Sequence, residues 1–121
     1  MTKKVLIAED YADTRTMMRY LLQHFGYEVL EAADGQEAVN LTQSNHPDLI
    51  LMDISMPIMD GLTATQTIRK MNGFGKIPII AVTSHAMVGD EIDARKAGCD
   101  DYLPKPIDED ALLQKIKKYL G

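Results

Sequence analysis

The stretch DLILMD, residues 48–53, places four consecutive apolar residues directly before a carboxylate. The segment SMP at residues 55–57 then stops the strand, because proline has no N–H with which to pair a neighbouring strand. A short apolar run bounded by turn residues is typical of a strand buried on both faces, as in a parallel sheet covered by helices. Asp53 is therefore predicted at the carboxyl end of a central strand, where open α/β sheets place ligands and chemistry.

Further strands and helices follow from the spacing of apolar residues on either side of this stretch. Apolar runs predict four more strands, at residues 5–8, 28–32, 78–82 and 101–103. The run at 28–32 alternates polar and apolar side chains and is expected at an edge. Helical spacing predicts five helices, at residues 14–25, 35–45, 61–71, 87–97 and 109–120. Five strands that alternate with five helices imply right-handed crossovers and a parallel sheet with helices on both faces.

Particular side chains are expected to fix these helices. The first helix should face the core through Met17, Met18, Leu21, Leu22 and Phe25. Polar residues at helix starts are expected to act as N-caps or to lie near them: Asp13, Asp34, Asp60 and Asp108. The fourth helix is the least marked, because it has Gly89 in its first turn and few apolar anchors.

Composition limits the classes of function open to the chain. It has 121 residues, 45% hydrophobic and 26% charged, which is ordinary for one soluble globular domain. No apolar run approaches the length of a membrane span, and the N-terminus leads into a strand rather than a signal peptide. The single cysteine, Cys99, excludes an internal disulfide and is expected as a small buried side chain. A net charge of -5 without a basic run disfavours nucleic-acid binding. We therefore expect a cytoplasmic domain with no nucleic-acid or membrane partner.

Four strands end on reactive side chains, which argues against the simpler interpretation that Asp53 only caps the next turn. These residues are Glu9-Asp10, Asp53, Thr83 and Lys105. A parallel sheet would bring them to one edge, where three carboxylates would repel one another and raise at least one pKa. Mg²⁺ would relieve this repulsion, since it prefers oxygen ligands. The set suits phosphoryl transfer, in which a carboxylate can serve as the nucleophile and form an aspartyl-phosphate.

With these motifs in order, the chain resembles the receiver domain of two-component response regulators from end to end. The matching segments are Glu9-Asp10, DISMPIMDG at residues 53–61, Thr83, and Lys105 with the proline that follows it. The resemblance implies a flavodoxin-like, doubly wound fold with five parallel strands in the order 2-1-3-4-5. It also implies a single receiver domain over residues 1–121, with no effector domain.

The resemblance implies a phosphoacceptor and a set of metal ligands. Asp53 would accept the phosphoryl group. Mg²⁺ would be held by Asp10, Asp53 and the backbone carbonyl of Ser55, with Glu9 helping through a water molecule. Ser55 also stands at one of the variable positions that tend to set phosphoryl lifetime in the family, so that lifetime stays open.

Other residues would bind or sense the phosphoryl group by the same resemblance. Thr83 and Lys105 would bind its oxygens, and the bond from Lys105 to the next proline would be cis. Tyr102 occupies the switch-aromatic position, although plain packing in a strand would also explain it. Ser84 and His85 are further candidates for tuning phosphoryl lifetime, while a solvated histidine is an equal alternative.

The resulting hypothesis is a phosphorylation-switched signalling module rather than an enzyme. A phosphohistidine on a histidine kinase or phosphotransfer protein would donate to Asp53, and the receiver would catalyse only this transfer and its own slow dephosphorylation. Its output would be a changed surface over the fourth helix, fifth strand and fifth helix, read by a downstream protein that the sequence does not identify. The alternative is a small Mg²⁺-dependent phosphatase of haloacid-dehalogenase type. That class needs a second Asp two residues after the nucleophile, and this chain has Ser55 there. A flavin-binding module is disfavoured by the acidic loop at residues 9–13.

Overall fold

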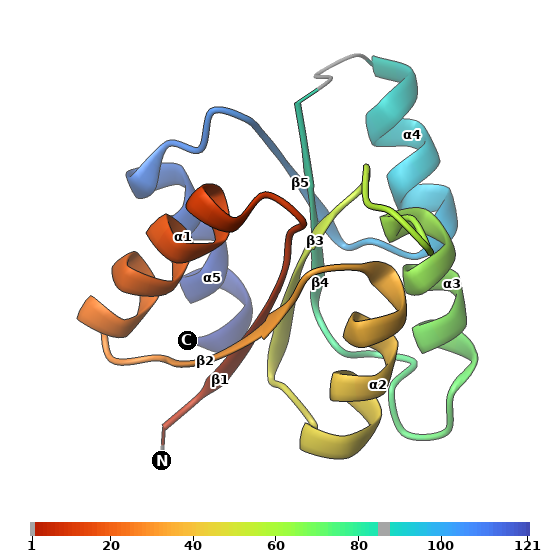
Figure 1. The fold of residues 1–121 in the computed structure, drawn as a ribbon, viewed down its shortest axis with the longest axis horizontal. Helices are drawn as coiled ribbons and strands as arrows, with labels where there is room; N and C mark the ends of the chain where they lie inside the picture. The colour runs from red at the N-terminus through yellow and green to blue at the C-terminus, as the bar shows by residue number, and fades with distance from the viewer. Residues whose placement is uncertain (1, 85–87) are drawn as a thin grey trace.

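The sheet orders its strands as β2-β1-β3-β4-β5, all parallel. A computed structural model describes residues 2–84 and 88–121, in which strands and helices alternate (Figure 1). The strands are β1 (Lys4–Ala8), β2 (Glu28–Ala32), β3 (Leu49–Asp53), β4 (Ile79–Thr83) and β5 (Asp101–Pro104). The helices are α1 (Ala12–His24), α2 (Gly35–Asn45), α3 (Gly61–Lys70), α4 (Val88–Ala97) and α5 (Glu109–Leu120). The predicted fold class and strand order are confirmed. The predicted start of the fourth helix at Met87 lies outside the described residues.

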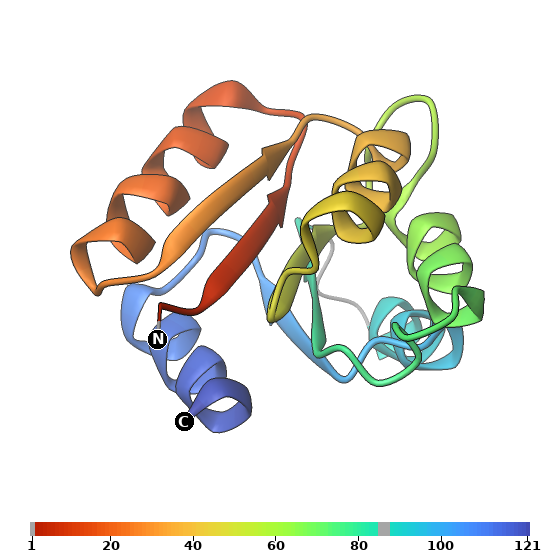
Figure 2. The same ribbon diagram turned by 90° about the horizontal axis from the view of Figure 1, so that it is seen from below.

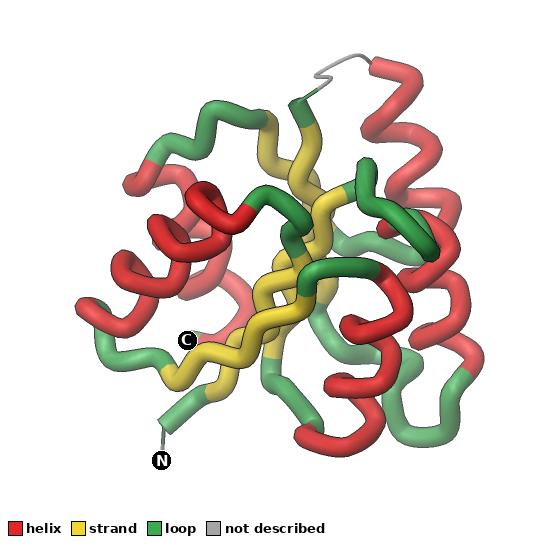
Figure 3. The backbone as a smooth tube through the Cα atoms, viewed as in Figure 1, coloured by secondary structure: helices red, strands yellow, loops and turns green. Residues whose placement is uncertain are grey.

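Helices cover both faces of the sheet, with α2, α3 and α4 on one face and α1 and α5 on the other (Figures 1 and 2). All five residues of β3 and of β4 are buried, because these central strands lie between the two helical layers (Figure 3). Successive side chains alternate between the two cores. Leu6 and Ile50 pack beneath α2, α3 and α4, while Val5 and Leu51 pack against α1 and α5. Two apolar cores therefore hold the carboxyl ends of the strands at one edge.

The edge position predicted for residues 28–32 is confirmed, since β2 pairs only with β1 and most of its residues are partly exposed. The prediction for the first helix is partly wrong. Met18 and Leu22 are buried, whereas Met17 is 49% exposed and Phe25 is 47% exposed. Met17 is turned by one residue from the buried stripe, and Phe25 lies beyond the helix as its C-cap.

The predicted caps form at two helices. Oδ1 of Asp34 accepts a hydrogen bond from the N–H of Glu37 at 2.8 Å, and Oδ1 of Asp60 accepts one from Thr63 at 2.8 Å. Asp108 occupies the N-cap position of α5 without a side-chain cap bond. In α1 the N-cap is Tyr11, and Asp13 lies in the first turn.

Cys99 is buried as predicted, with its sulfur 3.7 Å from the Thr65 hydroxyl. Within residues 2–84 and 88–121, none of the helices combines the length and apolar character that crossing a membrane requires.

Candidate functional site

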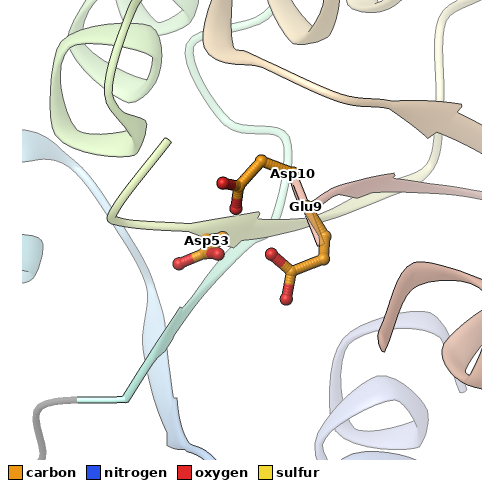
Figure 4. Close-up of side chains that lie close together, drawn as sticks. All are labelled: Glu9, Asp10 and Asp53. Carbon is orange, nitrogen blue, oxygen red and sulfur yellow. The ribbon is translucent and has the colours of Figure 1, made fainter. Parts of the chain in front are cut away.

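Three acidic side chains gather at the carboxyl ends of β1 and β3 (Figure 4). One carboxylate oxygen from each of Glu9, Asp10 and Asp53 lies within 4.8 Å of the others. The strand register explains this, because Ala8 of β1 is paired with Met52 of β3, so the following residues emerge side by side. Glu9 and Asp53 are 2% and 4% exposed, while Asp10 is exposed to solvent.

Lys105 joins the two buried carboxylates from the far side of β4. Its Nζ donates to Oδ2 of Asp53 at 3.1 Å and also donates to Oε1 of Glu9. Burial alone would lower the pKa of Lys105, but these hydrogen bonds and the two negative charges hold it above its ordinary value. The ammonium group therefore stays charged between the carboxylates.

Glu9 carries the raised pKa that crowded carboxylates were expected to produce. Burial raises the pKa of Glu9, the hydrogen bond and charge of Asp53 raise it further, and Lys105 offsets only part of the rise. A cation added beside Glu9, Asp10 and Asp53 would relieve this repulsion, and the donors are all oxygen atoms. This donor set fits a hard divalent cation such as Mg²⁺ and does not resemble the nitrogen and sulfur sites typical of zinc.

The remaining predicted residues lie around this cluster. Thr83 is the last residue of β4 and is buried, and Lys105 N–H donates to its carbonyl at 2.7 Å. Ser55 is exposed, and its N–H donates to Oδ1 of Asp53 at 3.1 Å. Ser84 is exposed and follows β4 directly. His85 lies outside the described residues.

Tyr102 lies in β5 on the face that carries α4. It is partly buried and packs against the core beneath α2, α3 and α4. Burial raises the pKa of its hydroxyl, and the charges of Asp90 and Glu91 on α4 add to the rise. The arrangement agrees with both interpretations of Tyr102, as a packing residue and as a switch. The bond from Lys105 to Pro106 is cis, as the resemblance implied.

A tightly folded loop, residues 54–60, connects the end of β3 at Asp53 to the start of α3 at Gly61. The N–H of Gly61 donates to the carbonyl of Ile54 at 2.9 Å, and a Cβ on Gly61 would lie 2.0 Å from the carbonyl oxygen of Asp53. Only glycine fits at this position. Within the loop, Met59 N–H donates to the Pro57 carbonyl at 2.7 Å across Ile58, whose φ of 68° is positive. This is a γ-turn of the rare, strained kind.

Sequence reasoning missed three features of the site. A cavity of about 380 Å³ beside Lys105 is lined by Thr14, Met17, Ser84, Lys105, Pro106 and Ile107. The isoleucine at the centre of the γ-turn is 85% exposed. A hydrogen bond from Arg15 to the Glu9 carbonyl is the third. None of the three had a signal in the sequence, because adjacent apolar residues such as Met17 and Met18 can share the buried face of a helix.

The family model of the response regulator receiver domain matches residues 5–117. The chain belongs to this family. This receiver is 43% identical to the polar-differentiation response regulator DivK of Brucella ovis, over all of this chain and 98% of that protein.

Solved receiver structures are similar over the whole length. The receiver domain of sensor histidine kinase PA1611 from Pseudomonas aeruginosa, solved with a magnesium ion coordinated in its active-site cleft, is 35% identical with a TM-score of 0.93. That alignment covers 100% of this chain and 99% of the other. The chemotaxis protein CheY4 of Vibrio cholerae is 31% identical with a TM-score of 0.94, covering 99% and 100% of the two chains. The receiver is thus a phosphorylation-switched module of two-component signalling, and these similarities do not support the phosphatase alternative.

Proposed function

We propose that Asp53 of this receiver accepts a phosphoryl group from a phosphohistidine in a Mg²⁺-dependent step. The observation that carries the proposal is the Asp53 carboxylate itself, buried at the end of a central strand between Lys105 and the acidic pair Glu9-Asp10. One Asp53 oxygen would form a new bond to phosphorus. The phosphorus–nitrogen bond of the donor would break, and its electron pair would leave with the imidazole ring.

The neighbouring residues would bind either the phosphoryl oxygens or the metal ion during this transfer. Lys105 would shift from the carboxylate to a phosphoryl oxygen as negative charge moves onto the phosphoryl group, and the Thr83 hydroxyl would bind a second oxygen. Asp10, Asp53 and the Ser55 carbonyl would hold Mg²⁺, with Glu9 acting through water. When bound, the metal neutralises charge on the phosphoryl oxygens. The magnesium in the cleft of the PA1611 receiver supports this assignment.

The donor is a histidine kinase or a histidine phosphotransfer protein. The family supports this partner class, and so does the PA1611 receiver, which is part of a sensor histidine kinase. We place part of the donor contact at the cavity between α1 and the segment after β5. Met17 is half exposed there and lies at the same cavity as Lys105. An apolar residue of the donor could bury Met17 while the phosphohistidine reaches Asp53.

The output surface proposed from the sequence is the one formed by α4, β5 and α5. One buried carboxylate ties its elements together: Oδ1 of Asp101 lies 2.9 Å from Nζ of Lys115 on α5 and 3.9 Å from Arg95 on α4. Arg95 on α4 and Tyr119 on α5 also both donate to the Asp100 carbonyl, so contacts at the start of β5 link the two helices. We also propose that residues 1–121 act as one receiver unit in the cytoplasm, with no chemistry beyond its own phosphorylation and slow hydrolysis.

Intact-mass analysis after incubation with acetyl phosphate and Mg²⁺ tests the central proposal. The wild-type protein should gain the mass of one phosphate in an alkali-labile bond, and Asp53→Asn should gain none while its circular dichroism spectrum is unchanged. The matched control is Asp13→Asn, an exposed residue of the first turn of α1. Labelling of Asp53→Asn at the wild-type rate, with phosphate mapped to Ser55 or Thr83, would disprove the assignment.

A further inference from the structure

The peptide bond that joins the two acidic residues Glu9 and Asp10 is held by an arginine from α1. Nη1 of Arg15 donates to the Glu9 carbonyl oxygen at 2.7 Å, reaching back six residues along the chain. A hydrogen bond between a charged donor and a carbonyl is stronger than one between neutral groups. Because this carbonyl belongs to the Glu9–Asp10 peptide, Arg15 fixes the plane of the peptide from which the Asp10 side chain departs.

Arg15 is itself held in place from the edge of the sheet. Its Nε lies 3.4 Å from Oε1 of Glu31 on β2, and the other oxygen of Glu31 accepts from Nη1 of Arg19 at 3.0 Å. The side chains of Arg15 and Glu31 are 21% and 30% exposed, so they are partly shielded from water. The contact therefore runs from β2 through Glu31 and Arg15 to the acidic loop.

Asp10 depends on this support more than its neighbours do. Glu9 is fixed by its N–H, which donates to the Ala32 carbonyl at 2.9 Å, and by Lys105 at its carboxylate. Asp53 is fixed by Lys105 and by the N–H of Ser55. Asp10 is exposed, and the peptide that Arg15 holds sets where its side chain leaves the main chain.

We infer that Arg15 is a positioning residue for the divalent-cation site, acting through the Glu9 carbonyl on the direction of the Asp10 carboxylate. This inference rests on the proposed Mg²⁺ site. Removing a group that orients a metal ligand commonly weakens metal binding by about 10–100-fold. Arg15 reaches the ligand through the main chain, so the expected loss is at the lower end of that range.

Electrostatics alone predicts the opposite sign, which makes the inference testable. Removing a positive charge near a cation site should strengthen Mg²⁺ binding. If Arg15 acts by position, its removal should weaken binding instead. Arg19 is the matched control, because it pairs with the same Glu31 and makes no contact with Glu9 among those the described residues show.

The experiment is a Mg²⁺ titration followed by NMR through the amide signals of residues 9–11 and 53. It compares the wild type with Arg15→Met, Arg15→Lys, Arg19→Met and Asp10→Asn. We expect Arg15→Met to weaken Mg²⁺ binding about 10-fold and Arg15→Lys about threefold, because lysine keeps the charge without the forked geometry. Arg19→Met should stay within about twofold of the wild type. Phosphorylation by acetyl phosphate should need more Mg²⁺ in Arg15→Met, with the rate at saturating Mg²⁺ unchanged.

The outcomes separate this inference from the proposed function. If wild-type binding persists in Asp10→Asn, the proposed metal site is wrong. If Asp10→Asn loses binding but Arg15→Met binds as the wild type does or more tightly, only the role of Arg15 is wrong. Equal weakening of Mg²⁺ binding in Arg15→Met and Arg19→Met would also overturn the role of Arg15, because a general destabilisation of α1 would then explain both results. Urea unfolding of each variant confirms that the titrated protein is folded.

Discussion

Nζ of Lys105 lies 3.1 Å from Oδ2 of Asp53, although β4 lies between β3, which ends at Asp53, and β5, which Lys105 follows. The long lysine side chain thus crosses the end of β4 to reach the acidic cluster, and it bonds Glu9 at the same time. One ammonium group bonds two buried carboxylates at this edge, and its single positive charge offsets only part of their negative charge. Removing the Lys105 ammonium group should therefore lower the stability of the metal-free protein and also impair phosphorylation.

Lys105→Met should destabilise the metal-free fold, because Glu9 and Asp53 would be left buried without a positive partner. We expect a loss of about 2 kcal/mol in the free energy of unfolding, less than for a fully buried pair because Lys105 is partly exposed. Urea denaturation in EDTA measures it, and added Mg²⁺ should restore part of the loss. Lys117→Met, an exposed residue of α5, is the control. A Lys105→Met protein as stable as the wild type in EDTA would show that Lys105 does not compensate the cluster.

Glu9 should make the metal-free protein less stable as pH rises. Burial raises the pKa of Glu9 above its ordinary value of 4.5, so the folded chain keeps this proton at pH values where the unfolded chain has released it. The free energy of unfolding therefore falls as pH rises from 4.5 through the folded-state pKa. Glu9→Gln lacks this titration. The wild type should lose stability relative to Glu9→Gln over this range, measured by urea denaturation in EDTA. The raised pKa of Glu9 would be contradicted if the difference in the free energy of unfolding between the wild type and Glu9→Gln stayed constant with pH. It would also be contradicted if the wild type gained stability relative to Glu9→Gln as pH rises.

Ile58→Asn should stabilise the protein by about 1 kcal/mol. A β-branched residue with positive φ is strained, whereas asparagine tolerates this region. Ile58 is 85% exposed, so the change gives up little burial. The control is Ile92→Asn on α4, 47% exposed and in a helix, which should lose about 0.5 kcal/mol. A loss of stability in Ile58→Asn would mean that the isoleucine side chain contributes contacts that outweigh the strain.

Phosphorylation should act on α4 and β5. Beryllofluoride with Mg²⁺, a phosphoryl mimic, should change hydrogen exchange over residues 84–105, because Thr83 would move toward the acceptor and Tyr102 would repack beneath α4. Tyr102→Ala should weaken binding of the downstream partner and leave phosphorylation at the wild-type rate. Exchange that changes only in α1 and α2 would place the output elsewhere.

The fold and the site cluster could be predicted because both depend on local patterns. The buried run before Asp53 fixes a central strand, and parallel strands deliver their terminal residues to one edge whatever their distance in sequence. The boundary of a helix and the exposure of a single side chain are harder to predict from the sequence. Met17 illustrates the second difficulty. It fits the helical spacing, yet the neighbouring methionine takes the place in the core.

The contacts that two arginine side chains make could not be predicted. Arg69 donates to the carbonyls of Gly98 and Ile77 at 2.9 and 2.6 Å and thereby ties the end of α3 to two later loops. Arg15 reaches the Glu9 carbonyl in the same way. Each contact depends on how elements pack after the chain has folded, and no spacing in the sequence encodes it. The strained turn at Ile58 could not be predicted either, because isoleucine ordinarily indicates a strand.

The outer strands of the sheet bear on how this protein behaves at high concentration. A strand at the border of a sheet offers unpaired N–H and C=O groups on which another chain can extend the sheet. β2 carries two glutamates among five residues, and β5 has four residues and ends in a proline. Charge discourages stacking at one border, while the short length and missing N–H discourage it at the other. These features lower the tendency of the two edge strands to pair with a strand of another chain.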